Sequence, residues 1–171
     1  MTPKLITSLS RLLQRISESN DLRPEIKSQK IISAFHGLAR PNISIHSYLQ
    51  RIFKYANCSP SCYVVAYIYL DRFTHRYPEL QINSYSVHRL LITSVMVSAK
   101  FLDDRYYNNA YYAKVGGIST TEMNFLEVMI LHVPKLQFPQ DQQISENNHL
   151  CFSTADHQDE SPHQKQHQLA V

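Results

Sequence analysis

The chain has 171 residues, of which 43% are hydrophobic and 18% charged, with only 3 glycines. This length suits one compact domain, and the composition excludes fibrous and wholly disordered proteins. The net charge of +3 is uneven: residues 1–138 hold 16 bases and 9 acids (+7), whereas residues 139–171 hold one base and five acids (−4). A basic body attracts phosphate groups or an acidic protein surface, so charge alone leaves both kinds of partner open.

The sequence has three cysteines, Cys58, Cys62 and Cys151. This odd number does not allow a framework in which every cysteine is paired in a disulfide. The first residues do not resemble a secretory signal, because residues 5–16 are apolar on one side only. We therefore expect a protein of a reducing compartment, in the nucleus, the cytoplasm or both, that is not secreted. The longest uncharged stretch, residues 55–70, is too short to span a membrane, so no crossing is expected.

Apolar residues recur at three- and four-residue steps through most of the basic body, which predicts helices. The first covers residues 5–16 and has one apolar face, so it should dock on another part of the protein. A second helix is predicted around residues 26–35, before Gly37 and Pro41, and a third over residues 44–55.

A Ser-Pro pair at residues 59–60 predicts the start of a helix, because the serine oxygen can accept a free backbone amide and proline has none to satisfy. This helix runs to residue 73 and is apolar nearly all round, which predicts that it is central and buried. The following helix should be capped by Asn83 or Ser84 and reach residue 102.

A short helix over residues 109–115 should end at the glycine pair 116–117, where a left-handed residue can stop it. Ser119 and Glu122 have the spacing of a capping box, which predicts a further helix that Pro134 ends. No stretch alternates with period two, so a sheet has little support.

The sequence thus predicts an all-α protein. Residues 1–37 form an N-terminal helical extension, residues 38–133 a single domain of about five core helices, and residues 134–171 a tail. The tail is rich in Gln, His and Asp, and we expect disorder there because it cannot bury enough apolar surface to offset its ordering entropy.

No catalytic pattern is present: the sequence lacks a phosphate-binding glycine loop, a metalloprotease helix and a nucleophile elbow. We therefore expect no enzyme activity, no small-molecule substrate, no cofactor and no metal. Cys58 and Cys62 lack a second pair at zinc spacing, so small buried thiols are favoured over ligands.

Three charged residues stand out because they lie beside apolar segments. Asp71, at the foot of the predicted central helix, is expected to be a structural carboxylate tied to a neighbouring helix. Lys100 precedes Phe101 and Leu102, and Glu127 lies between two apolar residues. Periodicity alone favours a solvated or snorkelling side chain for Lys100 and for Glu127.

Taken in order, several segments closely resemble the plant P-type cyclins, which are also called U-type and are related to fungal phosphate-signalling cyclins. The segments are SAFHGLARPNISI (33–45), YLQRIFKY (48–55), CSPSC (58–62), YIYLDRF (67–73), VHRLL (87–91), SAKFLDD (98–104), YNN (107–109) and VGG (115–117). The resemblance covers about residues 4–128, and the order of the segments is more specific than any one of them.

The resemblance implies a five-helix cyclin box and a non-catalytic regulatory subunit that binds and activates a cyclin-dependent kinase, in cell-cycle or nutrient signalling. It places Lys100 and Glu127 at the kinase interface, with Phe101 and Leu102 as the apolar anchor beside them. Many cyclins pair the acid that matches Asp71 with an arginine at the start of the first box helix; residues 42–44 of this chain offer none, and Arg40 is the nearest substitute.

Two alternatives stay open. Because the body is basic, a cyclin-fold adaptor for nucleic acid is conceivable, although the bases form no tight cluster and nucleic acid is the less favoured partner. The sequence after residue 128 departs from P-type cyclins, so the fifth box helix is expected to be shortened. Such a chain could be an unstable or interfering cyclin variant, because a lost turn exposes apolar core.

Overall fold

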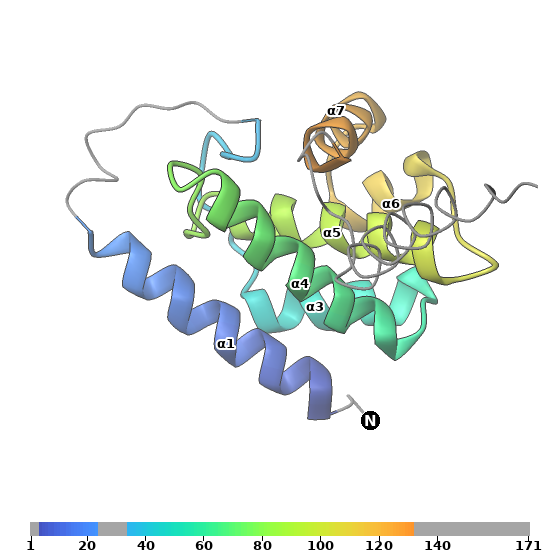
Figure 1. The fold of residues 1–171 in the computed structure, drawn as a ribbon, viewed down its shortest axis with the longest axis horizontal. Helices are drawn as coiled ribbons and strands as arrows, with labels where there is room; N and C mark the ends of the chain where they lie inside the picture. The colour runs from blue at the N-terminus through green and yellow to red at the C-terminus, as the bar shows by residue number, and fades with distance from the viewer. Residues whose placement is uncertain (1–3, 24–33, 132–171) are drawn as a thin grey trace, which may run out of the picture. The chain divides into compact units, whose positions relative to one another are not determined.

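The structure is a computed structural model that describes residues 4–23 and 34–131, and every regular element in these ranges is an α-helix (Figure 1). The helices are α1 (Lys4–Asp21), α3 (Ile45–Ala56), α4 (Pro60–Arg76), α5 (Val87–Leu102), α6 (Asn109–Gly116) and α7 (Thr120–Leu131). No residue of the two described ranges lies in a β-strand, and the predicted all-α class is confirmed.

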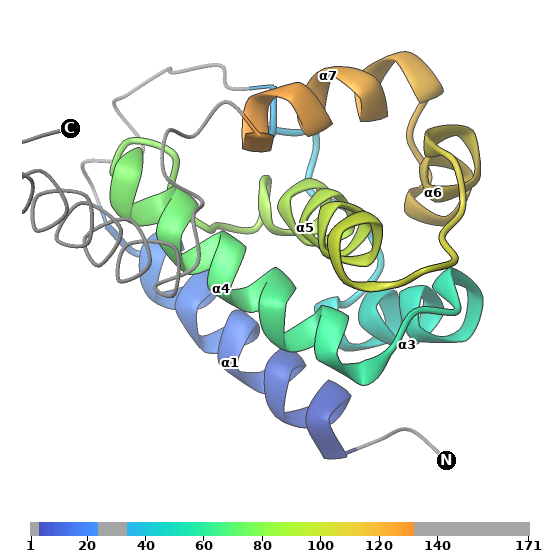
Figure 2. The ribbon, with the colours of Figure 1, turned by 45° about the vertical axis from the view of Figure 1, so that its right-hand side comes forward.

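The central helix is α5. It contacts α3, α4, α6 and α7, which surround it in Figure 2, and 11 of its 16 residues are buried. The prediction that the helix after residue 59 is central was wrong, because α4 buries only six of its 17 residues and leaves Val64 47% exposed.

The central position of α5 was not evident from the sequence, because polar residues interrupt its apolar stretch. The hydroxyl of Thr93 donates to the carbonyl of Arg89 at 2.7 Å, and that of Ser98 donates to the carbonyl of Ser94 at the same distance. Because these hydroxyls bond carbonyl groups of their own helix, they enter the core with their donors satisfied.

The first helix docks as expected. In α1 the buried side chains Ile6, Leu9 and Leu13 belong to the common core, and the helix contacts α3 and α4. Its last turn is tied to the segment before α5, since Asp21 accepts both the backbone amide and the hydroxyl of Ser84.

Most predicted helix ends are confirmed by their hydrogen bonds. Ser44 caps α3, accepting the amide of Ser47 at 3.1 Å. Gly117, with φ 73°, ends α6 in the left-handed region that glycine tolerates. At the start of α7, the Ser119 hydroxyl accepts the amide of Glu122 while the Glu122 carboxylate accepts the amide of Ser119, which is the predicted capping box.

Two helix starts differ from the prediction. The Ser59 side chain makes no capping bond, and its backbone amide instead donates to the carboxylate of Asp103. Asn83 caps a turn ahead of α5, accepting the amides of Tyr85 and Ser86. The turn places the first helical residue at Val87.

Some predictions fall outside the described residues. The helix expected at residues 26–35 lies there except for its last two residues, which are in a turn. The shortened end of the last helix, Pro134 and the tail 134–171 also lie outside.

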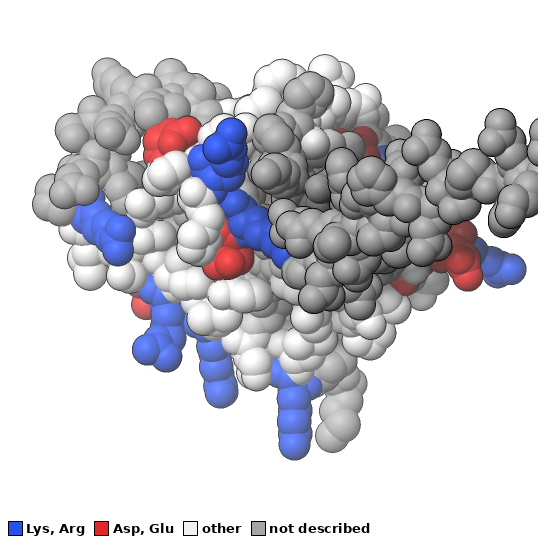
Figure 3. All heavy atoms as spheres, viewed as in Figure 1, with Lys and Arg blue, Asp and Glu red and all other residues white. Residues whose placement is uncertain are grey.

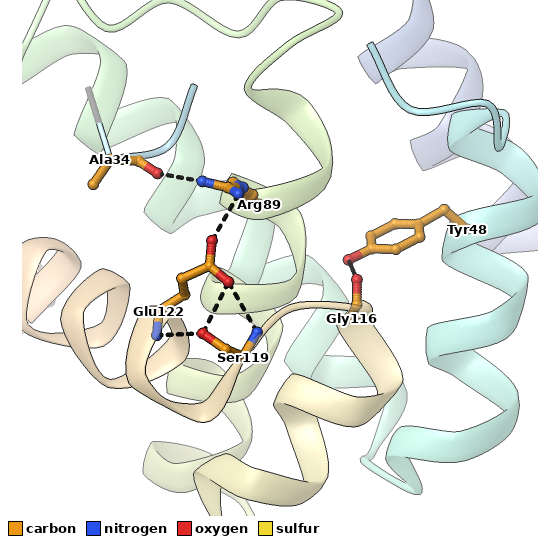
Figure 4. Close-up of polar contacts among 6 residues, drawn as sticks. All are labelled: Ala34, Tyr48, Arg89, Gly116, Ser119 and Glu122. Atoms are coloured by element: carbon orange, nitrogen blue, oxygen red, sulfur yellow. Dashed lines mark hydrogen bonds and ion pairs between the residues drawn. The ribbon is translucent and has the colours of Figure 1, made fainter. Parts of the chain in front are cut away.

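Arg89 on α5 holds α7 in place (Figure 4). Its guanidinium donates to the carbonyl of Ala34 at 2.9 Å and to Oε1 of Glu122 at 2.8 Å. The other carboxylate oxygen of Glu122 belongs to the capping box with Ser119. The bonds from Ser119 and the charge of Arg89 lower the pKa of Glu122, so one ionised side chain joins the start of α7 to the central helix.

The expectation for Asp71 is corrected by the structure. Its side chain is 52% exposed and lies 3.6 Å from Nδ1 of His75, one turn later on the same helix. The carboxylate therefore lies on the face of α4 that is turned away from the core, toward solvent. Asp71 is therefore not a buried link to a neighbouring helix.

Candidate functional site

Lys100, near the end of α5, and Glu127, in α7, form an ion pair with 2.6 Å between Nζ and Oε1. Their side chains are 27% and 17% exposed, so the pair lies at the edge of the core. The interpretation that periodicity alone favours, of Lys100 and Glu127 as solvated or snorkelling side chains, was wrong, because the packing of α7 against α5 brings the two into an ion pair.

Asn109, the first residue of α6, completes this ion pair. Its Oδ1 accepts a hydrogen bond from Nζ of Lys100, and its Nδ2 donates to Oε2 of Glu127 at 2.6 Å. Asn109 also donates to Oδ1 of Asn124, at 2.7 Å, one turn before Glu127. Sequence reasoning missed both asparagines, although the spacing of Asn124 and Glu127 by three residues is a helical-face signal.

Apolar side chains flank the ion pair. Phe101 and Leu102 are 64% and 39% exposed, and on α7 Val128 and Leu131 are 50% and 56% exposed. The two α7 residues were not predicted: Leu131 lies four residues after Glu127 on the same helical face, and Val128 follows Glu127 directly. We call the set Lys100, Phe101, Leu102, Glu127, Val128 and Leu131 the α5–α7 patch.

The end of α5 is anchored beside the patch by Asp103. Its carboxylate accepts the backbone amide of Ser59 at 3.0 Å and a bond from the thiol of Cys62 at 3.3 Å. Burial acts to raise the pKa of Asp103, but the bonds from Ser59 and Cys62 outweigh it and the pKa is lowered. Phe101 and Leu102 therefore project from a helix end fixed to the start of α4.

The thiols beside this anchor are suited to a structural role. Burial raises the pKa of Cys62 to about 12 and also raises that of Cys58, so both stay protonated near neutral pH. Within residues 4–23 and 34–131, no group of three His, Cys, Asp or Glu side chains is arranged to hold a metal ion.

The hydrogen-bonding capacity left in the ion pair determines what it can bind. The ammonium of Lys100 has three donors, of which Glu127 and Asn109 take two. In Glu127, Oε1 accepts a hydrogen bond from Lys100 and Oε2 accepts one from Asn109, and each oxygen keeps a further acceptor site. The pair thus offers one donor and two acceptor sites, which suits the unpaired carbonyl and amide groups of a partner's backbone.

Comparison with known proteins assigns the family. The sequence model described as Cyclin matches residues 3–137, which is most of the chain. The chain belongs to the cyclin family. Residues Lys100 and Glu127 lie inside the matched segment.

The curated relatives are plant U-type and P-type cyclins. Cyclin-U4-1 of Arabidopsis thaliana is 73% identical over 129 residues, 75% of this chain and 64% of that protein. Cyclin-P4-1 of Oryza sativa subsp. japonica is 58% identical over 133 residues, covering 75% of this chain and 63% of the relative. This cyclin is thus a U/P-type cyclin by similarity, and its matching segment spans less than two thirds of these two relatives.

On the face drawn in Figure 3, Lys and Arg side chains are scattered among uncharged and acidic residues. Among the helices of the described ranges, none has the length and apolar character needed to cross a membrane.

Proposed function

We propose that this cyclin is a non-catalytic regulatory subunit that binds and activates a cyclin-dependent kinase through the α5–α7 patch. The observation that carries the proposal is the ion pair of Lys100 and Glu127 beside four exposed apolar side chains. The process served is the control of cell division or nutrient signalling.

The patch suits a partner helix that must be held in one position. Lys100 can donate to a carbonyl and Glu127 can accept from an amide, so the two bind the backbone of the kinase's regulatory helix near its end. Phe101 and Leu102 pack against apolar side chains of the same helix and supply most of the affinity, because buried anchors usually outweigh ion pairs at the rim.

Activation then follows from a difference in affinity. A kinase is active when a glutamate on its regulatory helix pairs with the lysine that positions ATP. A cyclin that binds this arrangement better than the inactive one shifts the population toward it, and it makes no covalent bond itself.

Binding of a cyclin-dependent kinase from the same plant, measured by titration calorimetry with a phosphotransfer assay, tests the proposal. Lys100→Glu should weaken binding at least 10-fold, which corresponds to about 1.4 kcal/mol. The matched control is Lys4→Glu, which makes the same charge change at the exposed start of α1.

The double variant Lys100→Glu/Glu127→Lys separates binding from folding. The exchanged charges can still pair, so the melting temperature should recover toward that of the unaltered protein, but the donor and acceptors presented to the kinase are reversed. Binding should therefore remain lost. Unimpaired binding by both the single and the double variant would refute the assigned site, and no binding by the unaltered protein would refute the function.

A further inference from the structure

A concave surface lies between α3 and α6, away from the α5–α7 patch. It is a cavity of about 450 Å³ lined by Arg51 and Tyr55 of α3 and by Tyr111, Lys114 and Val115 of α6. At 100° per residue, Tyr111, Lys114 and Val115 lie on the side of α6 opposite Asn109, which holds the ion pair. The cavity and the patch can therefore be occupied at the same time.

The walls of this cavity are held by polar bonds and ring packing. Arg51 donates to the backbone carbonyl of Lys114 at 3.2 Å, and the hydroxyl of Tyr111 donates to the carbonyl of Tyr55 at 2.8 Å. The ring of Tyr107 stacks on that of Tyr111 with 3.9 Å between centroids. The site is thus formed before any ligand arrives, which lowers the entropy cost of binding.

The charge at this cavity is positive and uncompensated within the described residues. Arg51 and Lys114 line it, and the ammonium of Lys54 lies 5.2 Å from the ring centroid of Tyr55. The ion pairs formed in residues 4–23 and 34–131 involve Arg89, Lys100 and His75, and neither Arg51 nor Lys114, the two cations that line the cavity. A ligand that complements them carries more than one negative charge.

We propose that this cavity is a docking site for a phosphorylated segment of a partner protein. The phosphoryl group, with a charge near −2, binds between Arg51 and Lys114, since the free N–H groups of Arg51 and the ammonium of Lys114 are donors suited to phosphate oxygens. The neighbouring proline or aromatic residue of the segment packs against Tyr55 and Tyr111, which gives the peptide an advantage over free phosphate.

The phosphoryl group is preferred to a carboxylate because a single negative charge would leave one of the two lining cations, Arg51 and Lys114, without a counter-charge. A peptide is preferred to nucleic acid because the cations occupy one cavity and do not follow a path along which a phosphate backbone could run. The site is independent of kinase binding, so it can be tested on the cyclin alone.

Fluorescence anisotropy with dye-labelled randomised peptides tests the proposal. One library has a single fixed phosphoserine followed by proline, and two matched libraries have serine or glutamate in its place. We expect the phosphoserine library to bind at least 10-fold more tightly than either. Arg51→Met and Lys114→Met, which keep much of the apolar stem, should each reduce this binding at least 5-fold, whereas Arg11→Met on the exposed face of α1 should leave it unchanged. Thermal melts establish that each variant is folded.

Four results would overturn the proposal. Equal binding of all three libraries would exclude an anion site, and equal binding of glutamate and phosphoserine would exclude phosphate selectivity. Displacement of the peptides by inorganic phosphate at equal concentration would show that the rest of the peptide contributes no affinity beyond that of its phosphoryl group. Tighter binding of an eight-nucleotide single strand, lost with Arg51→Met, would assign the cavity to nucleic acid.

Discussion

The amide of Asn109 donates to Oε2 of Glu127 at 2.6 Å, while the opposite carboxylate oxygen receives Lys100. Glu127 is therefore held from two helices at once, α5 and α6. A carboxylate fixed in this way presents its remaining acceptor sites in one direction, and a partner that bonds them loses less rotational freedom of the side chain on binding.

Replacing Asn109 with aspartate should weaken kinase binding while leaving the fold intact. Asn109→Asp removes the amide donors and places a second carboxylate beside Glu127, which disrupts the ion pair with Lys100. An acid in the first turn of α6 is favourable to the helix, so the melting temperature should change by only a few degrees. Kinase affinity should fall at least 10-fold in calorimetry.

The neighbouring residue provides the control for this variant. Asn108→Asp adds the same charge at the exposed cap of α6, where aspartate caps as well as asparagine does. Equal kinase affinities for the two aspartate variants would show that the orientation of Glu127 does not matter.

The capping box at the start of α7 should contribute measurably to stability. Ser119→Ala removes the hydroxyl that accepts the amide of Glu122 and donates to its carboxylate, at a cost of about 1 kcal/mol in the free energy of unfolding. Thr121→Ala, an exposed substitution in the same turn, should be neutral or slightly stabilising, because alanine has the higher helix propensity. Urea unfolding of both variants checks this, and equal losses would contradict a specific role for Ser119.

Local signals made the helix ends predictable from the sequence. Ser44, Gly117 and Ser119 mark where helices begin or end through hydrogen bonds to residues within four positions, so sequence spacing alone identifies them. The family resemblance predicted that Lys100 and Glu127 lie at one interface, but neither it nor periodicity, which treats each helix separately, predicted the ion pair between them.

Contacts between distant helices were not predictable. Arg89 bonds Ala34 and Glu122, which lie 55 and 33 residues away in the sequence. No pattern within one segment indicates contacts between residues so far apart in the chain. Asn109 follows Asn108, and either could cap α6. The two have different roles only because Asn109 faces Lys100 in the folded protein.

The crossing of α5 and α6 should depend on the absence of a side chain at Gly116. A Cβ there would lie 2.9 Å from Cγ1 of Ile92 and 3.3 Å from the hydroxyl of Tyr48, which already donates to the Gly116 carbonyl. Gly116→Ala should therefore cost about 1–3 kcal/mol through overpacking.

A double-mutant cycle identifies the cause of that loss. In an Ile92→Ala background, where Cγ1 and Cγ2 of Ile92 are absent and only the Tyr48 hydroxyl remains close to the new Cβ, Gly116→Ala should cost markedly less. Gly117→Ala is the matched control: its Cβ would meet nothing within 4 Å, but its positive φ imposes a backbone cost that Ile92→Ala cannot relieve. The same penalty for Gly116→Ala in both backgrounds would exclude the contact with Ile92 as the cause.

Mild acid should destabilise the protein through His88. Its Nε2 donates to the carbonyl of Ile43 at 2.9 Å, whereas Nδ1 is buried without a hydrogen-bond partner among the described residues. Burial, opposed by the Ile43 bond and assisted by the charge of Arg40, lowers the pKa of His88 below 6.5. Between the two pKa values the unfolded chain binds more protons than the folded one, so stability falls as the pH drops below about 6.5.

Urea unfolding at pH 7.5 and pH 5.5 measures this dependence. His88→Gln retains a side-chain N–H that can reach Ile43 but does not titrate, so its loss of stability between the two pH values should be smaller than that of the unaltered protein. Burial also lowers the pKa of His36, so part of the dependence should persist. The interval from pH 5.5 to pH 7.5 lies above the pH range in which Asp103 and Glu122 take up protons, because the pKa values of both carboxyl groups are lowered. If His88→Gln loses as much stability as the unaltered protein, the buried imidazole does not cause the acid sensitivity.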